Sequence, residues 1–332
     1  MDKLELDATE RQMLMQLLDE IETKFSNLES DEALHHSAVF AHELPTRIRL
    51  TLNAFRLEQM SGVLCISGYA VDQERVGPTP GHWRDRPTPS SAHREELLLI
   101  LLSSLLGDPF GWATQQNGRL IHDVLPIKGH EREQLGSSSE APLTWHTEDA
   151  FHPLRGDFIS FACLRNPYAA ATTIGYVDSL ELPEATRSVL LQERFTISPD
   201  ESHLAKNNSK PGAMFAGIEE MQTNPDPVAV LFGDPARPYI RADPYFMSVT
   251  PGDDEAREAL SLLVSQMDEK IFDMRMESGD FCFLDNYRVV HGRKPFKARH
   301  DGTDRWLKRV NVVRDLRKSR TARQSAMART IN

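Results

Sequence analysis

The stretch WHTEDAFHPLRGDFISFACLRNP, residues 145–167, combines two potential metal ligands with a strand-forming run. His146 and Glu148 are separated by one residue, and side chains two positions apart point to the same face of an extended strand. Farther along, Phe158–Leu164 is apolar and follows Arg155-Gly156-Asp157, a sequence typical of a turn. The stretch therefore predicts a strand end carrying two ligands, then a turn and a buried strand.

A second motif, FLDNYRVVHGRKPFKARHDGTDRWLKR at residues 283–309, contains a further candidate ligand, His291. Two apolar runs in this region, Phe281–Leu284 and Arg288–His291, are separated by Asp285-Asn286. Short polar connections of this kind predict a hairpin. His291 would close the second strand of that hairpin, where a sheet could bring it beside the first two ligands.

His146, Glu148 and His291 match the triad of two histidines and one carboxylate that leaves adjacent positions open on iron(II). The pattern alone is weak, because about two His-x-acid pairs are expected by chance in a chain with 12 histidines. A second pair, His93 and Glu95, lies at a predicted helix start, where side chains two positions apart diverge, so we assign it to the surface. Structural roles are expected for His122, His130 and His152.

Composition and charge limit the classes of protein to which this chain can belong. Its 332 residues show no internal repeat and no linker, which favours a single domain over 1–332. A formal net charge of −11 argues against nucleic acid as a partner and favours a cationic ligand. The N-terminus lacks the apolar run of a signal peptide, and Leu97–Leu106 is too short to span a membrane, so a cytoplasmic protein without a membrane partner is expected. Reduced core positions are expected for the three cysteines Cys65, Cys163 and Cys282.

The first part of the chain, residues 1–109, is predicted to be mainly helical. Asp7 and Glu10 have the spacing of a capping box, and an apolar stripe follows them. The elements expected in this part are helices at 7–25, 46–57 and 94–106 and a buried strand at Val63–Ile66.

Short strands are predicted to dominate from about residue 110 to residue 315. Leu307–Val313 is a further strand candidate, and a helix is expected to begin near Asp253. The stretch 200–227 is long and polar, which is typical of a functional lid or of a disordered loop, and we expect a lid. These elements predict an α+β fold in which a β-sandwich or barrel core carries flanking helices.

The two motifs, 145–167 and 283–309, resemble the clavaminate synthase-like branch of 2-oxoglutarate-dependent oxygenases. Within that branch the chain is most similar to the L-arginine hydroxylases of peptide-antibiotic biosynthesis, of the viomycin and streptothricin type. The resemblance implies a double-stranded β-helix, or jelly roll, with added helices. It also implies hydroxylation of a free amino acid, L-arginine at C3 or at C3 and C4, by Fe(II) and O2. 2-Oxoglutarate would be decarboxylated to succinate in the same reaction.

The resemblance assigns the metal ligands to His146, Glu148 and His291. It assigns the distal carboxylate of 2-oxoglutarate to Arg305, fourteen residues beyond the second histidine, and to Thr173. A planar guanidinium is suited to this role because it binds a carboxylate through two parallel hydrogen bonds.

Four positions are implied to contact the amino-acid substrate. Gln115, or its neighbour Gln116, would hold the substrate amine together with the free oxygen of Glu148. Arg309 would lie near the substrate carboxylate, and Asp243 would pair with the cationic end. Some members of the family have two acids in the segment that contains Asp243, whereas this chain has one, so the identity of the substrate stays open.

Two alternatives remain at the level of sequence. The same chemistry could act on L-lysine, L-asparagine or another amino acid. A non-catalytic metal-binding jelly-roll protein would need neither Arg305 nor Thr173, so their joint presence favours an enzyme. Halogenation is disfavoured, because Glu148 occupies the position that halogenases of this type leave open for halide. The oligomeric state is not predicted.

Overall fold

The computed structural model describes residues 1–208 and 212–332. Within them, the α-helices are α1 (Ala8–Ile21), α2 (Asp31–Phe40), α3 (Thr46–Glu58), α4 (Gln73–Val76), α5 (His93–Ser104), α6 (Glu184–Leu190), α7 (Ala216–Thr223) and α8 (Asp254–Lys270). The strands are β1 (Asp2–Glu5), β2 (Val63–Ser67), β3 (Asp108–Trp112), β4 (His122–Val124), β5 (Leu143–His146), β6 (Phe158–Arg165), β7 (Thr172–Tyr176), β8 (Phe195–Ile197), β9 (Leu231–Asp234), β10 (Arg237–Ile240), β11 (Met247–Val249), β12 (Phe272–Met274), β13 (Phe281–Asp285), β14 (Val289–Arg293), β15 (Trp306–Val313) and β16 (Thr330–Ile331).

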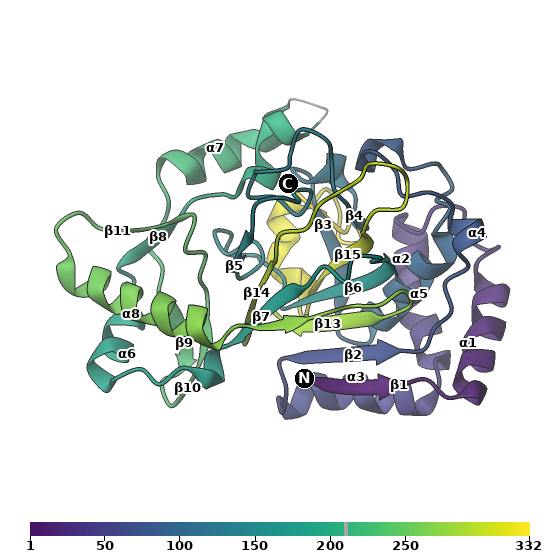
Figure 1. Cartoon of the computed structure of the whole chain (residues 1–332), viewed down its shortest axis with the longest axis horizontal. Helices are drawn as coiled ribbons and strands as arrows, with labels where there is room; N and C mark the ends of the chain where they lie inside the picture. Colours follow the sequence, from purple (N-terminus) through teal and green to yellow (C-terminus); the bar gives the residue numbers. More distant parts are fainter. Residues whose placement is uncertain (209–211) are drawn as a thin grey trace.

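Two sheets form the centre of the molecule (Figure 1). The larger sheet has the order β1-β2-β13-β6-β15-β3-β16, and β4 pairs with β15 beside this path. The smaller sheet has the order β12-β7-β14-β5. Parallel and antiparallel pairs both occur in the larger sheet, and helices flank it, so the predicted α+β class is confirmed.

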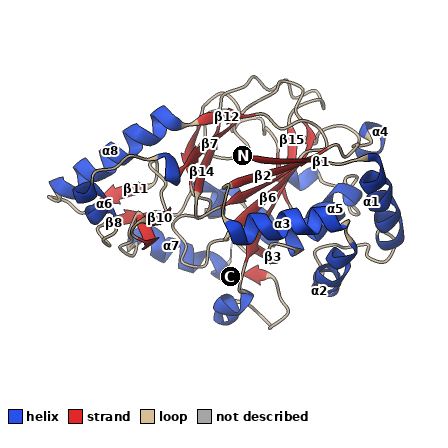
Figure 2. Cartoon of the chain, turned by 90° about the horizontal axis from the view of Figure 1, so that it is seen from below, coloured by secondary structure: helices blue, strands red, loops and turns tan. Residues whose placement is uncertain are grey.

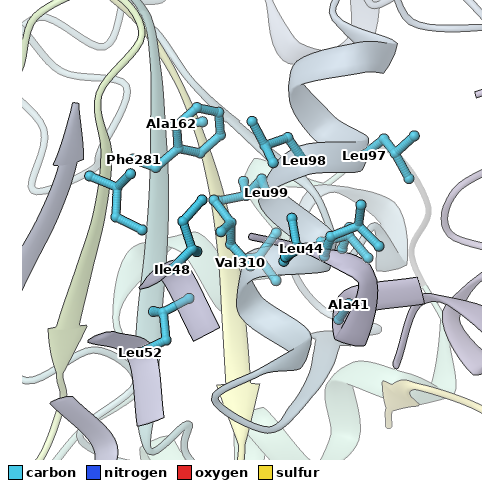
Figure 3. Packing of buried hydrophobic residues seen from close by; sticks show 14 of the residues in the cluster. Ala41, Leu44, Ile48, Leu52, Leu97, Leu98, Leu99, Ala162, Phe281 and Val310 are labelled. Carbon is cyan, nitrogen blue, oxygen red and sulfur yellow. The ribbon is translucent and has the colours of Figure 1, made fainter. Parts of the chain in front are cut away.

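The alternation of side chains along β6 places its two faces in different cores. Phe158 and Ala162 belong to the cluster formed with the N-terminal helices, which Figure 3 shows around Ala162. Ile159, Phe161 and Cys163 belong instead to the cluster that packs between the two sheets. Because successive side chains of a strand point to opposite faces, a strand that is covered on both sides is expected to be apolar on both. The mainly apolar sequence of β6, in which Ser160 is a buried exception, has this cause.

The N-terminal helices cover the outer face of the larger sheet (Figure 2). Helix α1 begins with the predicted capping box, because the Asp7 side chain accepts from the Glu10 backbone N–H and the Glu10 side chain accepts from the Asp7 N–H. In α5, every residue of Leu97–Leu102 is buried, because other helices lie on one side and the sheet on the other. Helix α2 was not predicted from the sequence.

A second group of elements extends from the other end of the molecule (Figure 2). It contains α6, α8 and the two small hairpin-like pairs β9–β10 and β8–β11. The predicted loop 200–227 lies beside this group and contains α7, so it is partly helical, and its residues 209–211 lie outside the described part of the chain.

The predicted hairpin between Phe281–Leu284 and Arg288–His291 is wrong. The corresponding strands β13 and β14 do not pair with each other, because β13 lies in the larger sheet between β2 and β6. Strand β14 lies in the smaller sheet between β7 and β5. The connection Asp285-Asn286 therefore carries the chain from one sheet to the other, and this crossing brings His291 into the smaller sheet.

All three cysteines are free and buried, as predicted for reduced core residues. Among the described residues, no helix combines the length and the apolar character needed to cross a membrane.

Candidate active site

The three predicted metal ligands lie together at the inner face of the smaller sheet. Strands β5 and β14 lie side by side (Figure 1), and His146, the last residue of β5, pairs directly with His291 of β14. Glu148 follows β5 by two residues, and its Oε2 atom lies 3.3 Å from Nε2 of His291 and 3.8 Å from Nε2 of His146. The candidate ligand atoms all lie within 4.8 Å of one another. Strand pairing has thus joined residues that are 145 positions apart in the sequence.

The orientation of the side chains in this cluster suits a divalent cation such as iron(II). His146 Nδ1 donates to the backbone oxygen of Thr144, which leaves the Nε2 lone pair free to bind a metal. Glu148 Oε2 is buried and has no hydrogen-bond donor of its own. Burial alone would lower the pKa of His146, but Glu148 and the charge of Asp243 raise that pKa to about 9. The surrounding carboxylates thus favour a positive charge at Nε2, and a metal ion that binds there replaces the proton. Burial lowers the pKa of His291 and favours the neutral imidazole that metals bind.

The backbone of Glu148 is held by Asn286, a residue that the sequence did not point to. Asn286 Oδ1 accepts from the Glu148 N–H at 2.9 Å, and Asn286 Nδ2 donates to the Glu148 backbone oxygen at 3.1 Å. The same Nδ2 donates to the oxygen of Gly156. One buried amide at the sheet-to-sheet connection therefore fixes the position of the carboxylate ligand.

Arg309 meets Glu148 on the oxygen that faces away from the histidines. Its Nη1 donates to Glu148 Oε1, and its Nη2 lies 3.3 Å from Gln115 Oε1 and 2.9 Å from His122 Nδ1. His122 Nε2 must donate to the Arg119 oxygen, so Nδ1 is the acceptor for Arg309. Burial, and then the nearby charge of Arg309, lower the pKa of His122 to about 3, which keeps this imidazole neutral.

Arg305 is buried in the cavity wall, and no carboxylate of the described residues neutralises its positive charge. Within the described chain it makes no ion pair with a carboxylate, and its side-chain contact is a long one, 3.4 Å from Nη2 to Thr172 Oγ1. Its Nε has no acceptor. Burial lowers the pKa of Arg305 to about 10, so the group is still a cation at neutral pH. A buried guanidinium without an ion-pair partner is suited to binding an anion.

The structure does not bring Thr173 to the cavity as predicted and places Thr172 there instead. Thr172 pairs with Arg293 and Thr173 with Gly292, so the two threonines point to opposite faces of β7. Thr172 lines the cavity and touches Arg305. The position assigned from the resemblance is therefore displaced by one residue, and a displacement of one residue reverses the face of a strand.

The cavity beside the triad has a volume of about 800 Å³ including its open mouth. Its titratable and charged lining residues are His146, Glu148, Asp149, Asp200, Asp243, His291, Arg293, Arg305 and Arg309. Both terminal nitrogens of Arg293 donate hydrogen bonds, to Ser138 Oγ and to three backbone oxygens, which favours a structural role for it. A second cavity adjoins the first, and Arg309 and Ser202 line both.

Asp243 lines the first cavity, as predicted, and it has an acidic companion. Its Oδ1 accepts from the backbone N–H groups of Tyr245 and Phe246. Burial raises the pKa of Asp243 to about 6, and the charge of Asp200 also raises it, whereas His146 lowers it. Asp200 lines the same cavity, from a segment 43 residues earlier. A second acid therefore lies in the cavity with Asp243, although it is not near Asp243 in the sequence.

Comparison with known proteins identifies the family. The model of the family described as taurine catabolism dioxygenase TauD, TfdA family, matches residues 89–311, about two thirds of the chain. The chain belongs to this dioxygenase family. It is 46% identical to enduracididine beta-hydroxylase of Streptomyces hygroscopicus, with 94% of each chain covered. It is also 41% identical to L-ornithine/L-arginine 3-hydroxylase of Catenulispora acidiphila, over the full length of both.

A solved structure resembles this dioxygenase over its whole length. The non-heme iron oxygenase OrfP, in complex with Fe, succinate and (3S)-hydroxy-L-Arg, superposes with a TM-score of 0.97 at 43% identity, and the match covers 100% of both chains. OrfP has also been solved with Fe and alpha-ketoglutaric acid, and with Fe and L-Arg. The prediction of an iron- and 2-oxoglutarate-dependent dioxygenase is therefore confirmed.

The sequence of this dioxygenase left open whether Gln115 or Gln116 contacts the substrate, and the two side chains have different partners in the structure. Gln115 Nε2 donates to Ser202 Oγ at 2.6 Å, and its Oε1 faces Arg309 at the border of the two cavities. Gln116 instead exchanges hydrogen bonds with the backbone of Asp123, which occupies both ends of its amide. Gln115 is thus the one whose amide faces Arg309.

The other histidines of this dioxygenase differ in their roles. His152 is buried against Trp112, as expected of a structural residue, and His130 is only partly buried. A structural role was predicted for His122, but this residue contacts Arg309. The pair His93 and Glu95 is not a surface pair, because Glu95 is buried and ion-paired with Arg75. Only knowledge of the spatial neighbours could have distinguished these cases.

Proposed function

We propose that this dioxygenase hydroxylates free L-arginine, at C3, and converts 2-oxoglutarate to succinate in the same turnover. The observation that carries the proposal is the distribution of charge around the triad. Arg305 and Arg309 line the cavity from the start of β15, and Asp200 and Asp243 line it from two other segments, close enough that the charge of Asp200 raises the pKa of Asp243. The arginines of such a cavity can bind carboxylate groups, and its acids can bind a cationic side chain. The cavity therefore suits a basic amino acid bound together with a dicarboxylate.

The triad His146, Glu148 and His291 would hold the iron. When bound there, iron supplies the activation of O2 that is coupled to decarboxylation of the oxo acid. The protein groups bind and orient the two organic molecules and keep water out of the buried cavity.

Arg305 would bind the distal carboxylate of 2-oxoglutarate. Its buried guanidinium has no ion-pair partner among the described residues, so an incoming carboxylate would both neutralise it and provide the acceptors that it lacks. Thr172 Oγ1, next to Arg305, can donate a further hydrogen bond to the same group.

Arg309, Gln115 and Glu148 would bind the amino and carboxylate groups of the substrate. In the present arrangement Arg309 donates to both Glu148 and Gln115. A substrate carboxylate would accept from Arg309, and the ammonium group would then donate to Glu148 Oε1 and Gln115 Oε1, which replaces the hydrogen bonds that Arg309 gives up. This exchange favours a zwitterionic free amino acid over a peptide or an N-acylated one.

Asp243 and Asp200 would bind the guanidinium of arginine. A planar guanidinium offers five N–H donors and can bridge two carboxylates, and Tyr245 and Phe246 beside Asp243 provide aromatic faces for it. The relative that hydroxylates enduracididine makes that amino acid a second candidate substrate.

The two sheets and the cavity between them support one oxygenase domain over residues 1–332, with a double-stranded β-helix as its core. The cluster of apolar residues that joins β6 and β13 to β7 and β14 supports this interpretation, because a core that is shared by both sheets cannot be divided.

A substrate assay tests the proposal. Purified protein is supplied with iron(II), ascorbate and 2-oxoglutarate, and succinate release is measured with each free amino acid and with enduracididine. Mass spectrometry then tests for addition of one oxygen to the amino acid. L-Arginine is expected to give succinate and hydroxyarginine in about equal amounts. If lysine or asparagine stimulates succinate release and arginine does not, the assignment of arginine is wrong.

A further inference from the structure

A histidine far from the metal ligands in sequence is completely buried beside them. His203 belongs to the short 3-10 helix η5 (Glu201–His203) and has 0% of its surface exposed. Its Nε2 lies 3.0 Å from Oδ1 of Asp149, the residue directly after the metal ligand Glu148. Its Nδ1 lies 2.7 Å from the hydroxyl of Thr114. Both ring nitrogens are therefore used for contacts within the protein.

Asp149 is fixed from several sides. Trp112 Nε1 donates to its Oδ2 at 2.6 Å, and Asn311 Nδ2 donates to the same oxygen at 3.1 Å. Its backbone has a φ of 52°, a left-handed conformation that residues other than glycine seldom adopt. Such strain persists only where the surroundings determine the conformation. The carboxylate of Asp149 thus helps to set the path of the chain as it leaves Glu148.

Asp149, Asp200 and His203 have the composition of a metal site, but their polar atoms already make hydrogen bonds within the protein. Both oxygens of Asp149 face fixed N–H donors, from Trp112 on one side and His203 on the other. Asp200 Oδ1 accepts from the backbone N–H and the hydroxyl of Ser202. The cluster is a hydrogen-bonded connection between two segments.

The segment that His203 holds also contributes to the cavity. Asp200 lines it, and Ser202 Oγ accepts from Gln115 Nε2. At its far end, Asn208 Nδ2 donates to the backbone oxygen of Thr114. Residues 200–208 thus lie against the loop after β3, and His203 is the contact that reaches the metal-ligand segment.

We propose that His203 is a positioning residue that holds residues 200–208 against Asp149, so that Asp200 and Ser202 face the amino-acid substrate. The inference rests on the proposed function for the identity of that substrate. Loss of His203 removes the 3.0 Å contact to Asp149 Oδ1, while Trp112 and Asn311 still donate to Oδ2. It also leaves the Thr114 hydroxyl without its partner and releases Asp200 from its place. Binding of the amino acid then weakens, whereas binding of 2-oxoglutarate at Arg305 is unaffected.

The test compares His203→Ala and His203→Gln with the wild type and with Lys206→Ala. Lys206 is an exposed residue of the same segment, with a surface ion pair to Glu201, and is the matched control. Glutamine retains one amide donor that can reach Asp149 and keeps the protein folded if the alanine variant fails to fold. Hydrogen exchange of 200–208 is measured without any amino acid, and KM is measured for arginine and for 2-oxoglutarate.

We expect His203→Ala to raise both the exchange rate of 200–208 and the KM for arginine about tenfold, the effect of losing one buried hydrogen-bonding partner. The KM for 2-oxoglutarate should change less than about twofold, and succinate should exceed hydroxyarginine, because an unanchored substrate uncouples the reaction. His203→Gln should fall between His203→Ala and the wild type, and Lys206→Ala should match the wild type.

Unchanged exchange in 200–208, faster exchange over the whole chain, or an equal rise of both KM values would overturn the proposal. If the wild type hydroxylates no basic amino acid, the proposed function is wrong. The hydrogen-exchange measurement still decides whether His203 holds residues 200–208 in place.

Discussion

The guanidinium of Arg309 donates to Oε1 of Glu148, while Oε2 of the same carboxylate faces the two histidines of the triad. The two oxygens of one residue therefore serve two tasks. One is directed to the metal position, and the other faces the position that we assign to the substrate amine. Binding of the amino acid and the charge at the metal site are thus linked through a single side chain.

Replacing Arg309 by lysine should weaken binding of the amino acid. Lysine keeps the charge but cannot reach Glu148, Gln115 and His122 at once, as the fork of the guanidinium does. We expect the KM for arginine to rise at least about tenfold, the equivalent of about 1.4 kcal/mol, and the KM for 2-oxoglutarate to change little. Steady-state kinetics measure both constants. Arg317→Lys, at an exposed position, is the control, and equal effects of the two variants would contradict the assignment.

Replacing Arg305 by lysine should instead affect 2-oxoglutarate. A lysine ammonium loses the two parallel hydrogen bonds to the carboxylate and is more costly to bury. The KM for 2-oxoglutarate should rise by about tenfold to a hundredfold, with the KM for arginine nearly constant.

Thr172→Val and Thr173→Val form a matched pair that tests the register of β7. Because Thr172 contacts Arg305 and Thr173 points to the opposite face, only Thr172→Val should raise the KM for 2-oxoglutarate, about fivefold for one lost hydrogen bond. A larger effect of Thr173→Val would mean that the side chain predicted from the sequence is the one in contact with the co-substrate.

Replacing His291 by alanine should abolish tight binding of iron. Two remaining ligands cannot provide the facial arrangement of the triad, and Glu148 loses its nearer imidazole. Iron retained after gel filtration, measured with a colorimetric chelator, should fall from about one per chain to near zero. Thermal unfolding of the iron-free protein reports whether the fold survives. His42→Ala, at an exposed position, should retain iron, and a His291→Ala variant that does the same would exclude the triad.

Asp243→Asn should impair the use of arginine. Removing one partner of a desolvated ion pair costs on the order of 3–5 kcal/mol, which corresponds to roughly a hundredfold or more in kcat/KM. Asp200→Asn should have a smaller effect, because Asp200 is less buried. Citrulline, a neutral analogue, should become a better substrate relative to arginine. Normal turnover of arginine by Asp243→Asn would show that the guanidinium binds elsewhere.

The stability of the fold should depend on pH through Glu96. This buried carboxylate is paired with Lys308 at 2.7 Å and Arg86 at 2.8 Å. Burial alone would raise the pKa of Glu96, but the two cations lower it to about 2 from an ordinary value of 4.5. Because the folded-state pKa is the lower one, the stabilisation is complete above about pH 4.5 and is lost as the pH falls toward 2.

At neutral pH the charge of Glu96 contributes on the order of 3 kcal/mol to the free energy of unfolding, and Glu96→Gln removes this contribution. Urea unfolding should therefore show a difference between wild type and Glu96→Gln that is constant above pH 5 and shrinks between pH 4.5 and pH 3. Glu74→Gln, at an exposed helix position, should show no such trend. A difference that does not change with pH would mean that the stabilisation does not come from the charge of Glu96.

Local features of this dioxygenase were determined by the sequence alone. The capping box of Asp7 and Glu10 and the apolar run of β6 depend on neighbours within a few positions, and both were predicted. The family was recognisable because its two motifs are continuous in the chain. His146, Glu148 and His291 were predicted as metal ligands from their residue types within these two motifs, and the fold brings them together.

Other features were decided only by the tertiary structure. The hairpin prediction failed because β13 and β14 bond to strands remote in sequence, which no local pattern reveals. Thr172 and Thr173 are adjacent and identical residues, so the sequence cannot distinguish them. The pairing of β7 with β14 decides which of them faces the cavity. Asp200, Asn286 and His203 became part of the site because folding placed distant segments in contact. The alternation of a strand and the geometry of a turn are local properties, whereas the identity of a neighbour across a cavity depends on how the whole chain packs.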